Sequence, residues 1–359
     1  MKERIAIVGA GIAGLATAIA LQKHNYEVEV FEKSEALQSV GAGIILQNNG
    51  IEALKKLGVN DFSKGKFLDG ISLSKPNGKV LMKIDTTQKR AITLFRSDLA
   101  NMLFDAVKVP VHFGCELESL KEGEVVSLSF LNGTRKSFDY VIGCDGLHSK
   151  VARNCFAPSL RDYGFDCYRT IVDDNINANV LTEMWGDGSV MGYVPLTNQK
   201  AYFYLCVKSG KEKERVSDQD LVNEFDSYPD QCLNLLTEPF IHHRIIGHQD
   251  PGILLKDNIV LLGDAAHTIS PFSGQGAGQG LEDAYYLDQL LSTGNPLKQA
   301  TEQLAELRNP RIQQFYKAGM INGKIGLMHD GMSKVLRNGL IKMVSPFASR
   351  RYNAQVQLN

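Results

Sequence analysis

The stretch that decides the fold is Arg4-Ile-Ala-Ile-Val-Gly-Ala-Gly-Ile-Ala-Gly14, an apolar β-type run that passes directly into Gly9, Gly11 and Gly14. The first glycine permits a tight turn, the second lets backbone approach a pyrophosphate, and the third lets the next helix pack on the strand. Apolar residues recur at helical spacing over 12–24, and residues 27–31 alternate as a second strand. Glu32 ends that strand, where a carboxylate can accept from ribose hydroxyls. The sequence therefore predicts a dinucleotide-binding strand–turn–helix.

A second glycine-rich region begins after the apolar strand expected over 258–262. That strand delivers Asp264 to its carboxyl end, which is the edge where open α/β sheets bind ligands. Pro271 and a run of glycines follow, before a helix expected near Gln279. The glycines suggest close backbone approach to a ligand, and the helix N-terminus favours negative charge there. The alternative is a surface loop with a capping Asp, against which the buried strand and the glycine density argue.

Length and composition narrow the class of protein. A chain of 359 residues with 43% apolar and 22% charged residues is typical of a globular protein of two lobes or one large α/β unit. The net charge of −1 provides no global field for nucleic acid. The six cysteines form no Cys-x-x-Cys pair or zinc-type spacing, and we find neither an export signal nor a membrane-spanning stretch. We expect a cytoplasmic protein with reduced thiols, no metal site and no integral membrane segment.

The order of expected elements divides the chain into parts. Short strands with turns at Asn77-Gly78 and Asn132-Gly133 precede a strand over 140–143, which enters Asp145-Gly146. Strands over 190–194 and 201–207 and a polar helix over 218–227 indicate a second lobe built on an antiparallel sheet. The predicted fold class is α/β, with a Rossmann-like cofactor domain, an α+β second lobe and a helical C-terminal region. The expected ranges are 1–70, 93–165 and 247–296 for the cofactor domain, 71–92 and 166–246 for the substrate domain, and 297–359 for the helical region.

On these motifs the chain resembles the class A flavoprotein monooxygenases, the superfamily of para-hydroxybenzoate hydroxylase and salicylate hydroxylase. The glycine turn with Glu32 resembles the fingerprint for the ADP part of FAD. Four further segments resemble the family's "DG" motif, its "GD" motif, its FAD-contacting arginine segment and its C-terminal Arg-x-Pro-Arg signature. These segments are 141–153, 263–271, 94–99 and 307–311, respectively. The matches span residues 5–311 in the family's order.

The resemblance implies FAD as cofactor and a role for individual residues. Glu32 would bind the adenosine ribose, Arg96 the ribityl or pyrophosphate region, and Asp264 the ribityl hydroxyls. Pro271 and the Gly274–Gly278 backbone would line the isoalloxazine ring. The alternative for Arg96 is a solvated charge at a helix start. The full set of expected cofactor-binding residues is Gly9, Gly11, Ala13, Gly14, Glu32, Lys33, Gly43, Arg96, Asp145, Gly146, Asp264, Pro271, Gly274, Gly276, Ala277 and Gly278.

The family also implies a reaction. Its members use NADPH or NADH and O₂ to hydroxylate a small aromatic or heteroaromatic, often phenolic, substrate through a flavin C4a-hydroperoxide. The alternatives are a bulky polycyclic antibiotic of tetracycline type or a quinone precursor as substrate, or a non-catalytic binding protein on the same fold. The length leaves no second Rossmann unit, so we expect the nicotinamide cofactor to dock transiently around Asp145. Arg153 either takes part in this binding or forms a salt bridge that holds the Asp145 turn. We expect a monomer or a homodimer.

Substrate-side candidates lie on the two strands of the second lobe. Tyr193, Tyr202 and Tyr204 are candidates near the flavin, together with Pro271, although aromatic residues on strands often belong to the core. Alternation places Tyr202 and Tyr204 on one face and Phe203 on the other. The segment from Val40 to Ile44 matches a family segment near the flavin. The following Gln47-Asn48-Asn49 departs from the Pro-Asn of salicylate-type members, so their substrate does not transfer.

The remaining expectations concern the histidines and the C-terminal residues 331–359. We interpret His267 as structural rather than as a catalytic base, and we expect His242, His243 and His248 at a solvated surface. Residues 331–359 hold five Lys or Arg and no Asp or Glu, with apolar residues on one helical side. We expect a helix packed on the domain with its charges solvated, and the alternative is contact with a membrane surface.

Overall fold

The computed structural model describes residues 2–37, 42–209, 218–236, 239–329 and 331–358. Its first sheet has six strands in the order β18-β19-β12-β1-β2-β8, and every neighbouring pair is parallel except β18 with β19. The apolar residues of the central strands are buried on both faces, as in other parallel sheets. The strands are β1 (Arg4–Val8), β2 (Glu27–Phe31), β8 (Val111–His112), β12 (Tyr140–Gly143), β18 (Leu255–Lys256) and β19 (Ile259–Leu261).

Helices cover one face of this sheet and a small sheet covers the other. The helices that share its core are α1 (Ile12–Leu21), α2 (Asn48–Leu57), α3 (Arg96–Ala106), α8 (Gly276–Ser292) and the long α9 (Leu297–Gly326). On the other face, Phe31 stacks on Phe130 of a three-stranded sheet, beside the short helix α4 (Lys150–Cys155). The strands of that sheet are β9 (Leu117–Lys121), β10 (Val126–Phe130) and β11 (Arg135–Phe138).

The second large sheet has seven strands in the order β17-β13-β16-β15-β14-β5-β6. Its neighbouring pairs are antiparallel, except that β14 and β5 run parallel. The short helices α5 (Asp218–Asn223) and α6 (Asp230–Leu233) pack on one face. The strands are β5 (Gly70–Ser74), β6 (Val80–Asp85), β13 (Leu160–Asp173), β14 (Val180–Trp185), β15 (Ser189–Pro195), β16 (Lys200–Lys208) and β17 (Ile241–His248).

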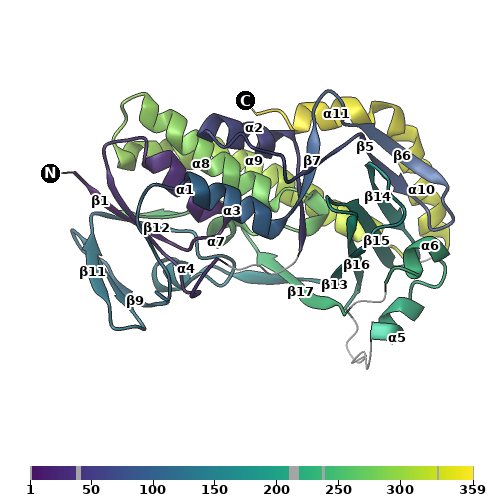
Figure 1. Cartoon of the computed structure of the whole chain (residues 1–359), viewed down its shortest axis with the longest axis horizontal. Coiled ribbons are helices and arrows are strands. Elements are labelled where there is room, and N and C mark those ends of the chain that lie inside the picture. Colours follow the sequence, from purple (N-terminus) through teal and green to yellow (C-terminus); the bar gives the residue numbers. More distant parts are fainter. Residues whose placement is uncertain (1, 38–41, 210–217, 237–238, 330, 359) are drawn as a thin grey trace.

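Two features connect the sheets, which lie toward opposite ends of the long axis (Figure 1). Helix α9 starts in the core of the first sheet and ends against the second, where Gly326 packs beside Trp185. A three-stranded sheet of β3 (Gly43–Leu46), β7 (Ala91–Phe95) and β4 (Lys66–Leu68) lies between them. A Cβ atom on Gly43 would lie 2.6 Å from Tyr202 of β16, so this strand passes directly over the second sheet.

The predicted fold class is confirmed, with two shifts in element bounds. Both hairpin turns form, with Gly78 and Gly133 at φ +78° and +84°. Helix α8 begins at Gly276 rather than near Gln279, because packing of the helix overrides the poor helix propensity of its first residues. The helix expected over 218–227 ends at Asn223, where turns bring Phe225 into the core. No helix among the described residues combines the length and apolar character needed to cross a bilayer.

The expectation for the C-terminal tail is wrong in its orientation. Helix α10 (Gly331–Val344), the turn η2 (Ser345–Phe347) and α11 (Ala348–Gln355) pack beside β6. However, the apolar residues of α10 other than Ile341 face outward, whereas Arg337 is 4% exposed. The guanidinium turns inward because it donates to four backbone carbonyls at the end of α9 and of β14. Periodicity showed which residues share a side of the helix, but not which side is buried.

A buried ion network joins helices α7 (Asp264–His267), α8 and α9. Glu282 and Asp283 are fully buried in α8, and Arg308 of α9 binds both carboxylates. Arg311 forms two further bonds to Glu282, at 2.7 and 2.8 Å. His267 lies 2.5 Å from Asp283. Burial opposes the ionisation of Asp283, but His267 and Arg308 together lower its pKa to about 2. The C-terminal Arg-x-Pro-Arg segment thus supplies the cations for this network.

Replacing Arg308 with Met should lower the free energy of unfolding by about 3–5 kcal/mol, because two buried carboxylates then lose a shared cation. Urea denaturation of the holoprotein measures this loss. The matched control is Arg244→Met, which removes the exposed Arg244–Asp162 ion pair and should leave the midpoint unchanged. Equal midpoints for the two variants would contradict a stabilising role of the network.

Candidate active site

Four neighbouring strands of the first sheet end at one edge. Strands β2, β1, β12 and β19 are adjacent and parallel, so their carboxyl ends lie together. The glycine turn follows β1, Glu32 follows β2, Asp145 follows β12, and Asp264 follows β19. Ligands of open α/β sheets bind outside this edge. The fold therefore brings motifs from three distant parts of the sequence to one place.

The glycine turn after β1 is shaped by close backbone contacts. Gly9 has φ +104°, and a Cβ atom there would lie 2.5 Å from the carbonyl oxygen of Cys144. A Cβ atom on Gly14 would lie 1.9 Å from the carbonyl oxygen of Gly9. Gly11 differs, because it is exposed and a Cβ atom there would meet nothing within 4 Å. No side chain caps the N-terminus of α1 at Gly11, so its N–H groups face open space and fit a phosphate.

Glu32 lies directly beside this turn. Its carboxylate accepts from the N–H of Ala10 at 2.7 Å and from the N–H of Ser34 at 3.0 Å. The side chain is half-buried, and the adjacent Lys33 is exposed. The carboxylate is thus held at the end of β2, within one residue of the glycines, which fits the adenosine side of a dinucleotide.

The segment after β12 forms a capped turn. Asp145 accepts from the N–H groups of Lys150 and Val151 at 2.7 and 3.3 Å, which holds the start of α4, and Gly146 has φ +80°. The other carboxylate oxygen of Asp145 is buried and has no partner among the described residues. Burial raises the pKa of Asp145 despite these bonds. Arg153 donates to the carbonyls of His148 and Ser149, and among the described residues it forms no salt bridge with Asp145.

The loop after β19 requires a second close approach. Gly263 has φ +59°, and a Cβ atom there would lie 2.4 Å from the Cβ atom of Ala13 in α1. Its N–H donates to Asp283 at 3.1 Å, so the buried network fixes this turn. Asp264 follows at the start of α7 and is exposed at the edge of the sheet. The exposed Asp264 is therefore available to ligand hydroxyls.

The remaining part of this loop leads to α8. Pro271 starts a short turn (η1, Pro271–Ser273) and is exposed, and Gly274 has φ +62°. Helix α8 then begins without a side-chain cap, and a Cβ atom on Gly276 would meet nothing within 4 Å. Its first N–H groups are thus open to a negative ligand atom. Ala277 is partly buried, whereas Gly278 is buried and faces Gln275 and Asn49 rather than open space.

Gly43 and Arg96 lie in the small sheet between the two large ones. Arg96 starts α3, its N–H donates to the carbonyl of Ala42 at 2.8 Å, and its side chain is exposed. Gly43 pairs with Phe95 in the neighbouring strand. Of the segment from Val40 to Ile44 that resembles a family segment near the flavin, positions 40 and 41 lie outside the described residues.

The second sheet presents Tyr202 and Tyr204 on one face, as the alternation predicts. Their ring centroids are 6.0 Å apart, and Phe203 packs into the core on the other face. The face with Tyr204 also carries Trp185 and meets Phe272, the residue after Pro271. This face of the sheet is therefore turned toward the loop that leads to α8.

A polar cluster on this face was not anticipated from the sequence. Glu183 of β14 accepts from the Tyr204 hydroxyl and from the Trp185 indole N–H, each at 2.5 Å. Burial raises the pKa of Glu183 although both donors oppose the rise. The pKa of Tyr204 is also raised, first by burial and then by the charge of Glu183. Both side chains keep a partly accessible edge. The available signal was a single acidic residue in the otherwise uncharged run of β14.

Arg169 adds a cation to the same face. It lies directly opposite Tyr204 in the pairing of β13 with β16, and residues opposite each other in a sheet share a face. Its Nη2 atom is 2.5 Å from Nε2 of His243. Its Nε atom is buried and has no partner among the described residues. A buried unpaired donor of this kind fits a ligand oxygen.

Tyr193 lies apart from the other tyrosine candidates. Its ring packs against Phe203 on the opposite face, and its hydroxyl donates to Asp174 at 2.9 Å. It lines a cavity of about 550 Å³ on that outer face, between β5, β14 and α6. The structure thus brings Tyr202, Tyr204 and the Pro271 loop together, but not Tyr193.

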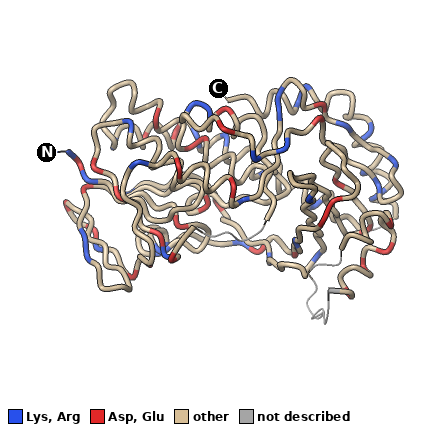
Figure 2. The backbone as a smooth tube through the Cα atoms, in the orientation of Figure 1, with Lys and Arg blue, Asp and Glu red and all other residues tan. Residues whose placement is uncertain are grey.

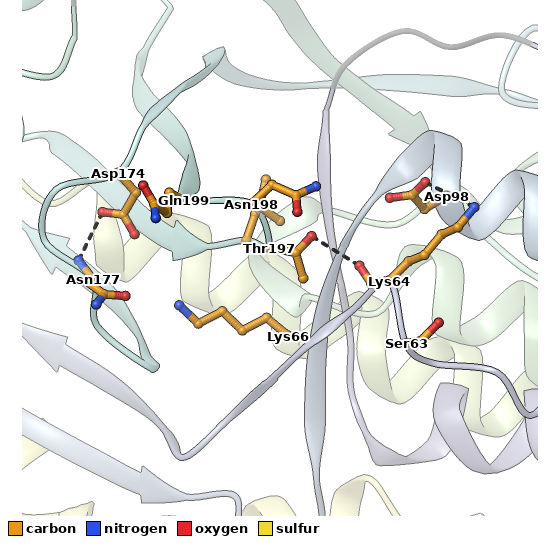
Figure 3. Close-up of a pocket in the computed structure, with 10 residues that line it drawn as sticks. Ser63, Lys64, Lys66, Asp98, Asp174, Asn177, Thr197, Asn198 and Gln199 are labelled. Carbon is orange, nitrogen blue, oxygen red and sulfur yellow. Dashed lines mark hydrogen bonds and ion pairs between the residues drawn. The ribbon is translucent and has the colours of Figure 1, made fainter.

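A second cavity, of about 610 Å³, is polar and lies beside the start of α3 (Figure 3). Lys64 faces Asp98 at 3.9 Å, and the Thr197 hydroxyl donates to the Lys64 carbonyl at 3.3 Å. In Figure 3 the Lys66 side chain extends toward the loop with Asp174 and Asn177. Its lining includes none of the residues expected to bind the cofactor or the substrate.

The histidines are placed differently from one another. His267 is buried in the ion network, at the end of α7. His242 and His243 are exposed, whereas the surface position expected for His248 is wrong, because that side chain is only 2% exposed. Its Nδ1 atom accepts from the N–H of Thr268 at 3.0 Å, which requires a neutral ring. Burial and the nearby His267 lower the pKa of His248 to about 4.

The residues present fit FAD. The glycines leave open space at two uncapped helix N-termini, those of α1 and α8, where backbone N–H groups favour the pyrophosphate and a reduced, anionic flavin ring. Glu32 and Asp264 place carboxylates at the same edge for hydroxyl groups. Within the described ranges, no cluster of three or more His, Cys, Asp or Glu side chains could hold a metal ion.

Comparisons with known proteins agree with this geometry. The profile of a family described as "FAD binding domain" matches residues 2–307. The 2-heptyl-3-hydroxy-4(1H)-quinolone synthase of Pseudomonas aeruginosa strain UCBPP-PA14 is 29% identical, over 97% of this chain and 95% of its own. The aurachin C monooxygenase/isomerase of Stigmatella aurantiaca is 28% identical, over 99% and 97%. The crystal structure of Klebsiella pneumoniae HpxO with FAD and uric acid superposes with a TM-score of 0.87, at 21% identity, over 99% and 96%.

Gly11→Ala should lower the affinity for FAD at least about tenfold, which corresponds to about 1.4 kcal/mol, without destabilising the apoprotein. The added methyl group meets no protein atom, so only a ligand in that space can oppose it. Flavin fluorescence titration of the apoprotein and its thermal midpoint measure the two effects. The control is Gly339→Ala in α10, where the methyl group also meets nothing. Unchanged FAD affinity in Gly11→Ala would place the pyrophosphate elsewhere.

The stability of the protein should fall as the pH drops from 6.5 toward 4, in part because of His248. In this window the unfolded chain binds a proton that the folded ring, with its pKa near 4, does not bind. The contribution is full above pH 6.5 and amounts to about 3 kcal/mol at most. His248→Gln should therefore make the pH dependence of urea unfolding shallower in this range. A slope identical to that of the parent protein would show that folding does not lower the pKa of His248.

Proposed function

This chain belongs to the FAD-binding class A flavin monooxygenases, and as its specific activity we propose hydroxylation of a small aromatic or heteroaromatic substrate. It is an FAD-dependent monooxygenase that uses NAD(P)H. In the proposed reaction a ring C–H bond becomes C–OH, one atom of O₂ enters the product, and the other leaves as water. NAD(P)H supplies the two electrons as a hydride, and one proton from solvent completes the balance. The single observation that carries the substrate class is the Tyr204–Glu183–Trp185 cluster beside the Pro271 loop.

We assign the cofactor contacts from the open positions at the sheet edge. The uncapped N-terminus of α1 at Gly11 would hold the pyrophosphate, and Glu32 would accept from the adenosine ribose. Asp264, which is exposed, would accept from the ribityl hydroxyls, and Arg96 would reach the same region from α3. Pro271 and the Gly274–Gly276 turn would border the isoalloxazine ring. When bound, FAD supplies the two-electron and oxygen chemistry that no side chain provides.

The polar cluster supports a substrate with an acidic O–H or N–H group on an aromatic ring. The Tyr204 oxygen can accept from such a group while its own O–H donates to Glu183. Because burial raises the pKa of Glu183, this carboxylate is a stronger base than an exposed one and suits uptake of the substrate proton. Arg169, with its unpaired Nε, can stabilise the oxygen that becomes negative. Deprotonation makes the ring a better nucleophile.

The apolar surroundings support the aromatic character of the substrate. Trp185 and Phe272 belong to the apolar cluster that surrounds Tyr204, and Tyr202 adjoins it. Such walls exclude water, which otherwise competes with the substrate for the reactive oxygen. The name of the quinolone synthase refers to a fused heteroaromatic ring. A bicyclic heteroaromatic with one ionisable ring substituent is therefore the first class of compound to test.

Tyr204→Phe should raise KM for the true substrate roughly tenfold and shift the pH at which kcat rises, because the proton relay to Glu183 is cut. The matched control is Tyr193→Phe, which removes a hydroxyl on the opposite face of the same sheet and should leave KM and kcat unchanged. NAD(P)H oxidation and incorporation of ¹⁸O from labelled O₂ are measured together over a panel of hydroxylated aromatics and quinolones.

Two outcomes would overturn the proposal. Absence of ¹⁸O incorporation with every compound of the panel contradicts hydroxylation of this class. Equal effects of the two tyrosine variants contradict the assignment of the substrate face. The flavin absorbance of both variants should match that of the parent protein, which separates loss of cofactor from loss of substrate binding.

A further inference from the structure

The C-terminal region carries an exposed apolar surface that the oxygenase chemistry does not use. Seven large apolar side chains of α10 and η2 are at least half exposed, and we refer to them as the α10 face. The α10 face consists of Met332, Val335, Leu336, Leu340, Met343, Val344 and Phe347, with exposed fractions of 50% to 78%. Contiguous apolar patches of this kind mark sites of interaction with a protein or a membrane.

The outward orientation of this face is held by specific contacts. Arg337, on the opposite side of α10, donates to the carbonyls of Ile325 and Gly326 at 3.3 and 3.2 Å. It also donates to the carbonyls of Trp185 and Gly186, both at 3.4 Å. Lys334 forms an ion pair with Asp187 at 2.6 Å. Rotation of α10 to bury its apolar residues would break all of these bonds and leave polar groups unpaired in the interior.

The charged residues within the C-terminal segment itself are all cations, and the acidic Asp187 beside it is paired with Lys334. Lys342, Arg350 and Arg351 are exposed in α10 and α11, and residues 331–359 contain no Asp or Glu. Figure 2 shows Lys and Arg in blue over the end of the molecule where Figure 1 places α10. An apolar helix face bordered by cations is complementary to a surface that is both apolar and anionic.

We propose that the α10 face docks the protein on the surface of an anionic lipid bilayer. The helix would lie in the plane of the membrane, with its apolar side chains at the boundary between head groups and acyl chains. Lys342, Arg350 and Arg351 would contact the anionic head groups. The proposal does not depend on the identity of the substrate. It places β14, which holds Arg337 and carries Glu183, next to the membrane surface.

A second copy of the chain is a less suitable occupant. In a symmetric dimer the same patch faces itself, so the three exposed cations of each copy would approach those of the other. The segment has no acidic residue with which to pair them. A bilayer that contains anionic lipid neutralises these charges instead.

The test is sedimentation of the full-length holoenzyme with large vesicles, at low and high salt. Vesicles of phosphatidylcholine with phosphatidylglycerol should bind the protein, whereas phosphatidylcholine alone should bind it at least tenfold more weakly. The double variant Leu336→Ser/Leu340→Ser should lower the partition coefficient on anionic vesicles at least tenfold. The matched control is Val125→Ser/Leu131→Ser, which removes two apolar residues that are 46% and 58% exposed at the other end of the molecule.

A second double variant tests the electrostatic contribution to membrane binding. Arg350→Gln/Arg351→Gln should weaken binding to anionic vesicles and reduce its dependence on salt. Failure to bind anionic vesicles at low salt overturns the proposal, as does an equal loss in the control variant. Light scattering after gel filtration measures the oligomeric state. A dimer that Leu336→Ser/Leu340→Ser converts to a monomer would identify the α10 face as a self-association site and overturn membrane docking.

Discussion

Two carboxylates without access to solvent impose the central constraint on this structure. Glu282 and Asp283 are adjacent in α8, and charge in the interior is tolerated only when it is paired and hydrogen-bonded. The partners come from α9, from α7 and from Asn49 of α2, which donates to Glu282 at 2.6 Å. The carboxylate of Asp283 also accepts a hydrogen bond from the N–H of Gly263. The network therefore sets the position of α8 relative to the turn that presents Asp264.

The ion network also explains how α8 can begin without a side-chain cap. The start of α8 has no cap of its own, and Gly276 faces empty space. Such an end is stable because the helix is held three to seven residues later, at Gln279 and the two carboxylates. The free N–H groups are then available to a ligand instead of to the protein. The second sheet completes the site from the other side, through Phe272 and the face with Tyr204.

The sequence was most informative where one residue type serves one local geometry. Gly9, Gly14 and Gly263 were recognisable because their turns leave no room for a Cβ atom, and Gly78 and Gly133 because their hairpins need positive φ. The cluster of Glu183 and Tyr204 could not be predicted, since it depends on the register of β14, β15 and β16. The side of the sheet that Tyr193 occupies and the burial of His248 likewise depend on tertiary packing. Helical periodicity grouped the apolar residues of α10, but only the carbonyls that bind Arg337 determine that this group faces outward.

The strand order of the first sheet has a consequence for biosynthesis. Strand β1 lies between β2 and β12, and β12 in turn pairs with β19, so the partners in two of these pairs, β1 with β12 and β12 with β19, are more than 100 residues apart in the chain. The carboxyl edge is completed only after residue 261 has left the ribosome, and Arg308 must follow to neutralise α8. At translation rates of ~5–20 residues per second, the first strands wait roughly 15 to 55 seconds for these partners. Until then the apolar edges of the first strands have no native partner, which is the state in which nascent chains are most prone to aggregation.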